Sequence, residues 1–504
     1  MKSIYYSRLW RITIFSFCIF PVFLISCVDS VSVEPVEFDP SSPVKILSVA
    51  PDSIHVAAQM LISGENFSGY KDNITVEING KKAVDIGVNP QGTLIYCIVP
   101  SLKEAGEIRE VGEEVMATVK VFVNNVESNV SPKQHVYTFM QNVSTFLGYT
   151  DQDGNTAITD GSFKDAQFQS PFWLAFDTDV DGPKDEYGKP KKNIYLIEEN
   201  NGMRFIDMYN KRVETIFRTV GGSTGLHRPR TIAFTLNPDD KVYNRDTMII
   251  ANDGDDWNWN GTVIIPRDSI TRKFTNGTPN PWQVVMHHKQ CNGGAIHPIT
   301  GDYWFNSYSQ SQVYKVFQRS NPATGAMWRF GGPTINDLNE DGKEALKAVF
   351  RVQDVNWEFN TQIAPSGSFA YFVSKNQHYI ARSEYDFAKG LFQPPIPFAG
   401  SKQRSGFKDG VGHGNTLFWE PQQGAFDKDD NFYVADGENH CIRKVTPQGQ
   451  VSTFAGRPGR PGYSDGALRD AQFDSPFGII YDDAIQTFYI ADRDNRRIRA
   501  IKVE

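Results

Sequence analysis

The chain has 504 residues, of which 40% are hydrophobic and 22% charged, a composition typical of globular proteins with two or three domains. This composition excludes a chain that is disordered throughout. The formal net charge is −8 and no basic run with interleaved aromatic residues occurs, so the sequence predicts no nucleic-acid partner.

The N-terminus has the pattern of a secretory signal. Basic residues precede an apolar run at residues 12–25, which is too short to span a membrane comfortably. The run ends in Leu24-Ile25-Ser26-Cys27, which resembles the bacterial lipobox. The resemblance implies that residues 1–27 form a lipoprotein signal peptide, that Cys27 is acylated, and that the acyl chains anchor the protein to a membrane.

Three cysteines remain in the predicted mature chain, namely Cys97, Cys291 and Cys441. This odd, scattered set is neither a disulfide framework nor a zinc site, so we interpret all three as small buried side chains. Residues 28–42 are rich in Pro, Ser and acidic residues and predict a flexible tether. Asp29 is the one acid close to Cys27, which leaves the choice between the cell surface and the periplasm open.

Residues 43–139 have the alternation expected of a small β-sandwich. Apolar residues alternate at 44–49, 60–64 and 74–78, and Asn79-Gly80 indicates a hairpin. These turn glycines and apolar positions resemble the immunoglobulin-like IPT/TIG domain, for which we favour a spacer or docking role over a ligand site.

Residues 140–504 contain a repeat. The run at 432–443 is echoed by the run at 488–499, and weaker copies occur upstream. The copies begin with apolar runs at 171–177, 229–234, 293–296, 361–364, 421–427 and 476–482. Short strands repeated at this length predict an all-β fold in which a six-bladed β-propeller follows the sandwich. Because the last copy lacks its outer strand, we expect residues 143–148 to complete it and close the ring.

The best copies of this repeat resemble the NHL repeat. In that family the Asp and Asn of each copy brace turns, which implies this role for Asp436 with Asn439 and for Asp492 with Asn495. We interpret three arginines as braces from one blade to the next rather than as ligand contacts: Arg443, Arg497 and Arg499.

A partial calcium pattern occurs at Asp177, Asp179 and Asp181, which are followed by Gly182. The alternating carboxylates match an EF-type loop, but its twelfth position is Gly188 rather than Glu. The sequence predicts no other cofactor, and a solvated turn is the alternative to a calcium site here.

An aromatic, hydrophilic loop is the main candidate ligand site. Trp residues stack on sugar rings while Asp and Asn bind the hydroxyl groups. The loop contains Asp253, Asp255, Asp256, Trp257, Asn258 and Trp259. Weaker candidates on the same face are Trp282, Tyr308, Trp357, His378 and Trp419. The alternative is a loop that folds back to cover a blade.

Lipobox, tether, IPT/TIG-like domain and NHL-like propeller together resemble the surface glycan-binding lipoproteins of Bacteroidota. The resemblance implies an outer-membrane lipoprotein that binds polysaccharide or oligosaccharide without cleaving it, beside a TonB-dependent transporter and its lipoprotein lid in a starch-utilisation-like system. No nucleophile elbow or zinc-protease motif occurs, so no catalytic residue is predicted. A propeller polysaccharide lyase or hydrolase, and a protein-binding scaffold of the cell envelope, remain alternatives.

Overall fold

The computed structural model describes residues 34–503 except for 57, 105–106, 108, 110, 152–153, 155, 179–183, 185–191, 219–225, 236–246, 254–259, 269, 275–282, 288–290, 308–310, 317, 320–328, 331–348 and 353–358. Within these described residues the secondary structure is β-strand, with short 3₁₀ turns at η1 (Lys71–Asn73), η3 (Lys375–Gln377) and η4 (Gly437–Asn439) and no α-helix. The predicted all-β class is confirmed. No helix that could cross a membrane is found in this part of the chain.

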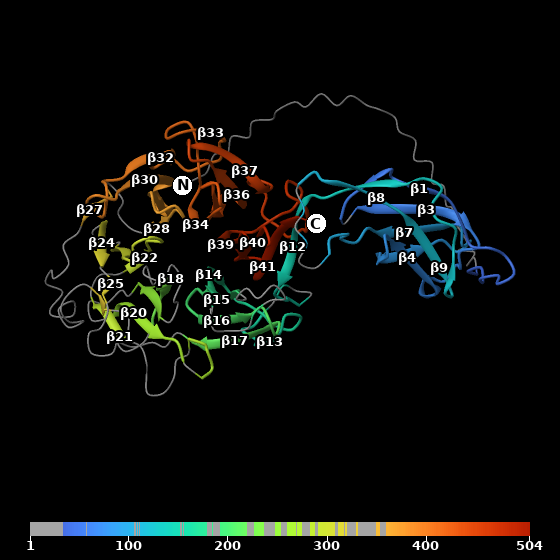
Figure 1. Ribbon diagram of the computed structural model, residues 1–504, viewed down its shortest axis with the longest axis horizontal. Helices are drawn as coiled ribbons and strands as arrows, with labels where there is room; N and C mark the ends of the chain where they lie inside the picture. Colours follow the sequence, from blue (N-terminus) through green and yellow to red (C-terminus); the bar gives the residue numbers. More distant parts are fainter. Residues whose placement is uncertain are drawn as a thin grey trace, which may run out of the picture.

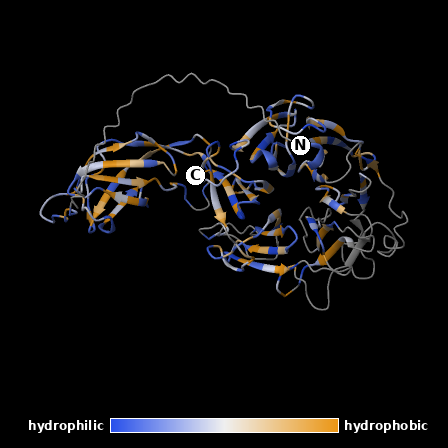
Figure 2. Cartoon of the chain, turned by 180° about the vertical axis from the view of Figure 1, so that it is seen from behind, coloured by the Kyte–Doolittle hydropathy of each residue, from blue (hydrophilic) through white to orange (hydrophobic). Residues whose placement is uncertain are grey.

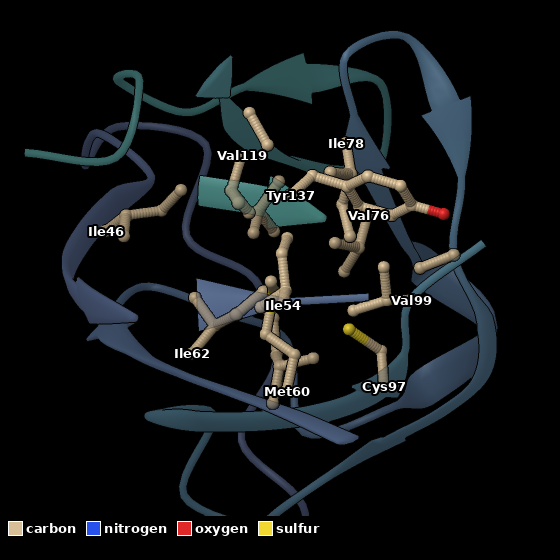
Figure 3. Close-up of a cluster of buried hydrophobic side chains, with 14 of the residues drawn as sticks. Ile46, Ile54, Met60, Ile62, Val76, Ile78, Cys97, Val99, Val119 and Tyr137 are labelled. Atoms are coloured by element: carbon tan, nitrogen blue, oxygen red, sulfur yellow. The ribbon is translucent and has the colours of Figure 1, made fainter. Parts of the chain in front are cut away.

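Residues 43–139 form a β-sandwich (Figure 1). Side chains along its strands point alternately into the core, which Figure 3 shows, and into solvent. One sheet has the order β1 (Lys45–Ala50), β3 (Gln59–Glu65), β7 (Leu94–Ile98) and β6 (Val84–Val88). Another has the order β10 (Val126–Glu127), β9 (Val119–Val123), β4 (Ile74–Ile78) and β5 (Lys81–Lys82). A third has β2 (Ser53–Ile54), β11 (His135–Thr138) and β8 (Glu114–Ala117). Alternate residues such as Val76 and Ile78 of β4 point into the core between the sheets.

The last part of the predicted tether lies against this sandwich. The Val36 amide donates to the Pro90 carbonyl oxygen (2.8 Å), and the Val36 carbonyl oxygen accepts from the Gly69 amide (2.8 Å). The Asn66 side chain also exchanges hydrogen bonds with the backbone of Asp39. Backbone pairing of this kind fixes residues 36–39 to the domain.

The rest of the chain forms sheets arranged around a common centre, as in a propeller (Figure 1). We number these sheets as blades 1 to 6 and give their strands from the centre outward. Blade 1 contains β14 (Pro171–Thr178), β15 (Lys192–Glu198), β16 (Gly202–Asp207), β17 (Arg212–Phe217) and β13 (Gly161–Ser162). Blade 2 contains β18 (Pro229–Phe234), β19 (Thr247–Asn252), β20 (Asn260–Pro266) and β21 (Gln283–His287). Blade 3 contains β22 (Cys291–Ile296), β23 (Tyr303–Ser307), β24 (Gln312–Val316) and β27 (Phe350–Arg351).

Blades 4 to 6 follow the same antiparallel order. Blade 4 contains β28 (Phe359–Ile363), β29 (Phe369–Ser374) and β30 (Tyr379–Asp386), with both β31 (Leu391–Phe392) and β32 (Ile396–Gly400) paired to β30. Blade 5 contains β34 (Pro421–Phe426), β35 (Phe432–Asp436), β36 (Cys441–Val445), β37 (Gln450–Gly456) and β33 (Gly410–Val411). Blade 6 contains β39 (Pro476–Asp482), β40 (Thr487–Asp492), β41 (Arg497–Val503), β12 (Gln141–Leu147) and β38 (Gly466–Ala467). A separate pair consists of β25 (Gln318–Arg319) and β26 (Arg329–Phe330).

Hydrophobic clusters between neighbouring blades hold the ring together. Each pair of neighbouring blades shares one cluster, and the series returns from blade 6 to blade 1. Figure 2 shows hydrophobic residues along the strands and hydrophilic residues in many of the turns. Burial of these faces against each other is the main stabilising contribution to the propeller. Cys97, Cys291 and Cys441 are buried and unbridged, as predicted.

The ring closes through strand exchange between the two ends of the propeller. Strand β12 pairs antiparallel with β41, with Val143 opposite Ile501, so the expected closing strand is confirmed. Val503 at the end of β41 also packs into the core of the sandwich, and Lys103 Nζ donates to its carbonyl oxygen (3.2 Å). The closing blade therefore joins the two domains.

Buried arginines brace three blades internally, and the prediction that Arg443 and Arg499 link one blade to the next is wrong, because the carboxylates that they contact belong to their own blades. Arg499 in blade 6 donates to Asp492 (2.8 Å) and Asp465 (2.6 Å), and Arg443 in blade 5 contacts Asp436 (2.7 Å) and Asp409 (2.5 Å) in the same way. Arg204 in blade 1 contacts Glu198 (3.0 Å) and Asp160 (2.9 Å). Both Asn439 and Asn495 donate to the Asp three residues before them, so the interpretation of these motifs as turn braces is confirmed. In blades 2 to 4 the second strand ends instead in Asn252, Ser307 and Ser374.

Candidate functional site at the propeller axis

The innermost strands have an irregularity at their first residues. The register of β14 with β15 skips Phe172, that of β18 with β19 skips Arg230, and that of β22 with β23 skips Asn292. Strands β34 and β39 have shifts at the corresponding place, whereas β28 pairs regularly. A β-bulge redirects the side chain of the unpaired residue, and bulges are frequent beside binding sites.

The second residue of every innermost strand lines one pocket. We call these residues the axial ring: Phe172, Arg230, Asn292, Asn360, Gln422 and Phe477. Trp173, Phe359 and Lys375 complete the lining, and the enclosed space is about 30 Å³. Because each blade contributes one residue of the axial ring, the pocket lies on the propeller axis, at the end where the innermost strands begin.

One side of the pocket is aromatic. Phe172 and Phe477 stack with ring centroids 3.7 Å apart and an interplanar angle of 28°. Trp173 lies beside them and is also largely buried. The Arg230 guanidinium carbon is 5.5 Å from the centroid of the Phe172 ring. Such a surface can pack against the C–H face of a ring-shaped ligand.

The other side carries carboxamides. Asn292 is 6% exposed, yet neither its Oδ1 nor its Nδ2 has a hydrogen-bond partner among the described residues. In contrast, Asn360 Oδ1 accepts from Gln362 Nε2 (3.0 Å). Next to Asn292, a Cβ on Gly293 would lie 2.7 Å from Asn360 Cα, so only glycine permits this approach of blades 3 and 4. A buried carboxamide without partners costs free energy in the empty protein, which indicates a ligand.

The pocket also carries positive charge. Arg230 and Lys375 are its only charged lining residues in the described part of the chain. Arg230 is held by Asp253 (Nη2 to Oδ2, 3.1 Å) and Glu199 (Nη1 to Oε1, 3.4 Å), neither of which lines the pocket. Lys375 Nζ is 3.7 Å from Glu420 Oε2. The acids therefore orient the cations from outside the pocket.

A larger cavity of about 380 Å³ is lined by the next residues of all six innermost strands. Trp173 lines both cavities, so the larger cavity lies next to the axial pocket. The Gln423 carboxamide bridges blades 5 and 1, because Oε1 accepts from the Leu174 amide (3.1 Å) and Nε2 donates to the Leu174 carbonyl oxygen (2.8 Å). The Gln423 side chain passes over Gly478. A Cβ at position 478 would lie 3.2 Å from Gln423 Oε1 and 2.5 Å from the Phe172 carbonyl oxygen, so a side chain there would be too close to both.

Three of the predicted ligand-binding residues lie in the described part of the chain, namely Asp253, His378 and Trp419. Trp419 is 44% exposed, does not line the axial pocket, and its backbone amide donates to Asp436 Oδ1 (2.7 Å). Asp253 is buried and supports Arg230 of the axial ring. His378 Nδ1 accepts from the Glu420 amide (3.2 Å), just as His440 Nδ1 accepts from the Ser475 amide (3.1 Å) one blade later. Both histidines have left-handed backbone angles, so they form a repeated turn. The other predicted ligand residues lie outside the described residues, namely Asp255, Asp256, Trp257, Asn258, Trp259, Trp282, Tyr308 and Trp357.

Of the calcium candidates, Asp177 is buried and pairs through both carboxylate oxygens with Arg267 (2.9 and 2.5 Å). Asp179, Asp181 and the lipidation residue Cys27 lie outside the described residues. No cluster of three or more His, Cys, Asp or Glu side chains arranged to hold a metal occurs among the residues that the structure describes.

None of the six residues of the axial ring was predicted from the sequence as a ligand contact. The available signal was the residue after the proline that opens a blade, which is Phe172, Arg230, Gln422 or Phe477. Polar Arg and Gln in an otherwise apolar run mark positions that do not face a blade core.

Comparison with known proteins places this geometry in context. The IPT/TIG domain family model matches residues 43–138. The solved structure of an auxiliary nutrient-binding protein from Bacteroides thetaiotaomicron is 32% identical, with 93% of this chain and 99% of that chain covered and a TM-score of 0.64. The chain belongs to the family of that Bacteroides protein.

Two further relatives carry other names. A Bacteroides thetaiotaomicron protein whose solved structure is named as a candidate phosphatase is 29% identical to this chain. The comparison covers 93% of this chain and 99% of that chain, with a TM-score of 0.64. Protein SUPPRESSOR OF QUENCHING 1, chloroplastic, from Arabidopsis thaliana is 26% identical over 356 residues, which are 69% of this chain and 26% of that protein. The chain thus spans about a quarter of the length of this curated relative.

Proposed function

We propose that this protein binds a nutrient molecule at the axial pocket without cleaving it, and that the nutrient is a polysaccharide or oligosaccharide. The observation that carries the proposal is the pairing of the stacked Phe172 and Phe477 with the unpartnered carboxamide of Asn292. Sugars need an apolar surface for their C–H faces and polar groups for their hydroxyls. The auxiliary nutrient-binding relative supports a binding role.

The lining residues favour binding over catalysis. Described residues of the lining include no carboxylate, histidine, serine or cysteine, and Lys375, whose amine could act as a base, lies 3.7 Å from Glu420 Oε2. The alternatives of a polysaccharide lyase or hydrolase, and of the phosphatase for which one relative is named, would have to rely on this single lysine among the described lining residues. A protein-binding scaffold would not require a small pocket on the axis.

The same proposal includes the setting of the protein. Acyl chains on Cys27 would anchor it to the outer membrane, facing the cell surface, and the residues after Cys27 would set its distance from the membrane. There it would deliver glycan to a TonB-dependent transporter and its lipoprotein lid in a starch-utilisation-like system. The Trp257 and Trp259 loop follows Asp253 in the chain and would add aromatic contacts to the same ligand.

Affinity gels containing a panel of plant, fungal and microbial polysaccharides test this proposal. The full chain should be retarded by at least one polysaccharide, with no release of shortened products and no release of phosphate from phosphorylated substrates. Product release would overturn the non-catalytic proposal, and absence of retardation with every polysaccharide would overturn glycan binding.

Matched variants then locate the site. Asn292→Leu should abolish retardation if the axial pocket binds the glycan. The double variant with Trp257→Ala and Trp259→Ala tests the loop separately. Tyr209→Ala is the control, because Tyr209 is 52% exposed in a turn of blade 1 and does not line the pocket.

A further inference from the structure

The size of the axial pocket limits which part of a ligand can enter it. Its enclosed space is about 30 Å³. A buried water needs roughly 10–15 Å³ of such space, so about two water-sized atoms fit. A sugar ring is far larger than this, whereas the two oxygen atoms of one carboxylate match it. The pocket therefore admits a few polar atoms of the ligand and leaves most of the sugar ring outside.

The charge of the lining selects the sign of that group. Arg230 and Lys375 line the pocket, while Asp253, Glu199 and Glu420 contact these cations without lining it. A guanidinium fixed by a buried acid is already oriented and pairs well with a carboxylate. Because the lining is largely buried, salt screens the attraction between a ligand carboxylate and these two cations less than it would at an open surface.

Asn292 adds a second requirement. A ligand carboxylate can accept a hydrogen bond from Asn292 Nδ2, but it cannot donate one to Asn292 Oδ1. A ligand that satisfies both atoms must carry a hydroxyl next to its carboxylate. The stacked Phe172 and Phe477 add an apolar surface at the edge of the same pocket for a ring's C–H face.

We propose that the axial pocket receives the carboxylate of a uronic acid unit, with the neighbouring sugar hydroxyl on Asn292 and the sugar ring against Phe172 and Phe477. In a hexuronate the carboxylate lies beside a ring hydroxyl, which matches this arrangement. The inference rests on the proposed function and names the class of sugar that the site takes.

Calorimetry with matched ligands tests the inference. Oligosaccharides of galacturonate, glucuronate and mannuronate are compared with their methyl esters, which keep the ring and hydroxyls but lose the charge. At least one acid should bind at least about tenfold more tightly than its ester, and added salt should weaken its binding. If every ester binds as tightly as its acid, or only neutral glycans bind, the uronate inference is overturned while the proposed glycan binding stands. If no carbohydrate binds, the proposed function itself fails.

Variants identify the groups responsible. Lys375→Met should reduce the preference for acid over ester, and it leaves no buried acid unpaired because the side chain of its partner Glu420 is 32% exposed. For Arg230 the paired change Arg230→Gln with Asp253→Asn avoids an uncompensated buried charge and should abolish the preference. An unchanged preference in both variants would overturn the assignment of the carboxylate to this pocket.

Discussion

Phe172 and Phe477 stack across the junction of blades 1 and 6, with ring centroids 3.7 Å apart. Replacing Phe477 by Leu keeps most of the apolar volume but removes the flat face, and such a change costs less than about 1.5 kcal/mol of stability. We expect the variant to fold and to lose about tenfold in glycan affinity, since an aromatic contact contributes roughly 0.5–1.5 kcal/mol. Calorimetry checks the affinity, and Tyr209→Ala should bind as the wild type does.

Replacing Asn292 should affect the free energy of unfolding differently from replacing an asparagine with a structural role. Asn439 is equally buried but donates to Asp436 (2.8 Å) and to the Gly406 carbonyl oxygen (2.8 Å). The substitution Asn439→Leu should therefore cost roughly 1–3 kcal/mol, whereas Asn292→Leu should leave the free energy of unfolding unchanged or raise it. Urea denaturation of the two variants measures this difference. Equal destabilisation would mean that Asn292 has a structural role.

The arginine brace of blade 6 should be important for stability and irrelevant for binding. Removing Asp492 deprives the buried Arg499 of its one fully buried carboxylate partner among the described residues and leaves Asp465, which is 43% exposed; disrupting a buried ion pair costs up to about 3–5 kcal/mol. We expect Asp492→Ala to lower the free energy of unfolding by this amount while the folded fraction keeps its glycan affinity. A large change in affinity would show that the brace also shapes the axial pocket.

His297 should make stability depend on pH. Burial lowers the pKa of His297 from 6.5 to about 4. Its Nε2 faces the Gly367 carbonyl oxygen (2.9 Å), and its Nδ1 accepts from the Ile299 and Thr300 amides, so the neutral ring is satisfied. Between about pH 4 and pH 6.5, His297 therefore binds a proton in the unfolded chain but not in the folded chain. Stability should therefore fall by roughly 3 kcal/mol from about pH 6.5 to 4.

The control for this prediction is His297→Gln, which does not titrate. Free energies of unfolding measured across that pH range should fall less steeply for the variant than for the wild type. If both slopes agree, the pH dependence arises from groups other than His297.

Local sequence patterns predicted much of the fold. The prolines at 171, 229, 421 and 476 each begin an innermost strand, and the strands β35 and β40 lie where the best repeats predicted them. These features depend on alternation and turn residues within one segment. The closing strand β12 was predictable because an incomplete last copy leaves an open sheet edge that must be paired.

The axial ring was not predictable in the same way. A bulge at Phe172 or Asn292 is a property of the register between two strands, which no pattern within one strand specifies. Residues as far apart in the chain as Phe172 and Phe477 meet only because the ring closes. The ligand contacts predicted at Trp257 and Trp259 rest on two aromatic residues within a hydrophilic stretch of sequence. They stay a prediction because both residues lie outside the described part of the chain.

The pairing of β12 with β41 also sets the order of events during synthesis. Strand β12 leaves the ribosome well before its partner β41, which follows about 350 residues later in the chain. Until then the edge of β12 that will pair with β41 has no native partner, and an unpaired edge can pair with other chains. Premature termination near residue 497 would therefore leave this edge open in every truncated chain, so we expect such products to aggregate rather than to form a propeller with one loose blade.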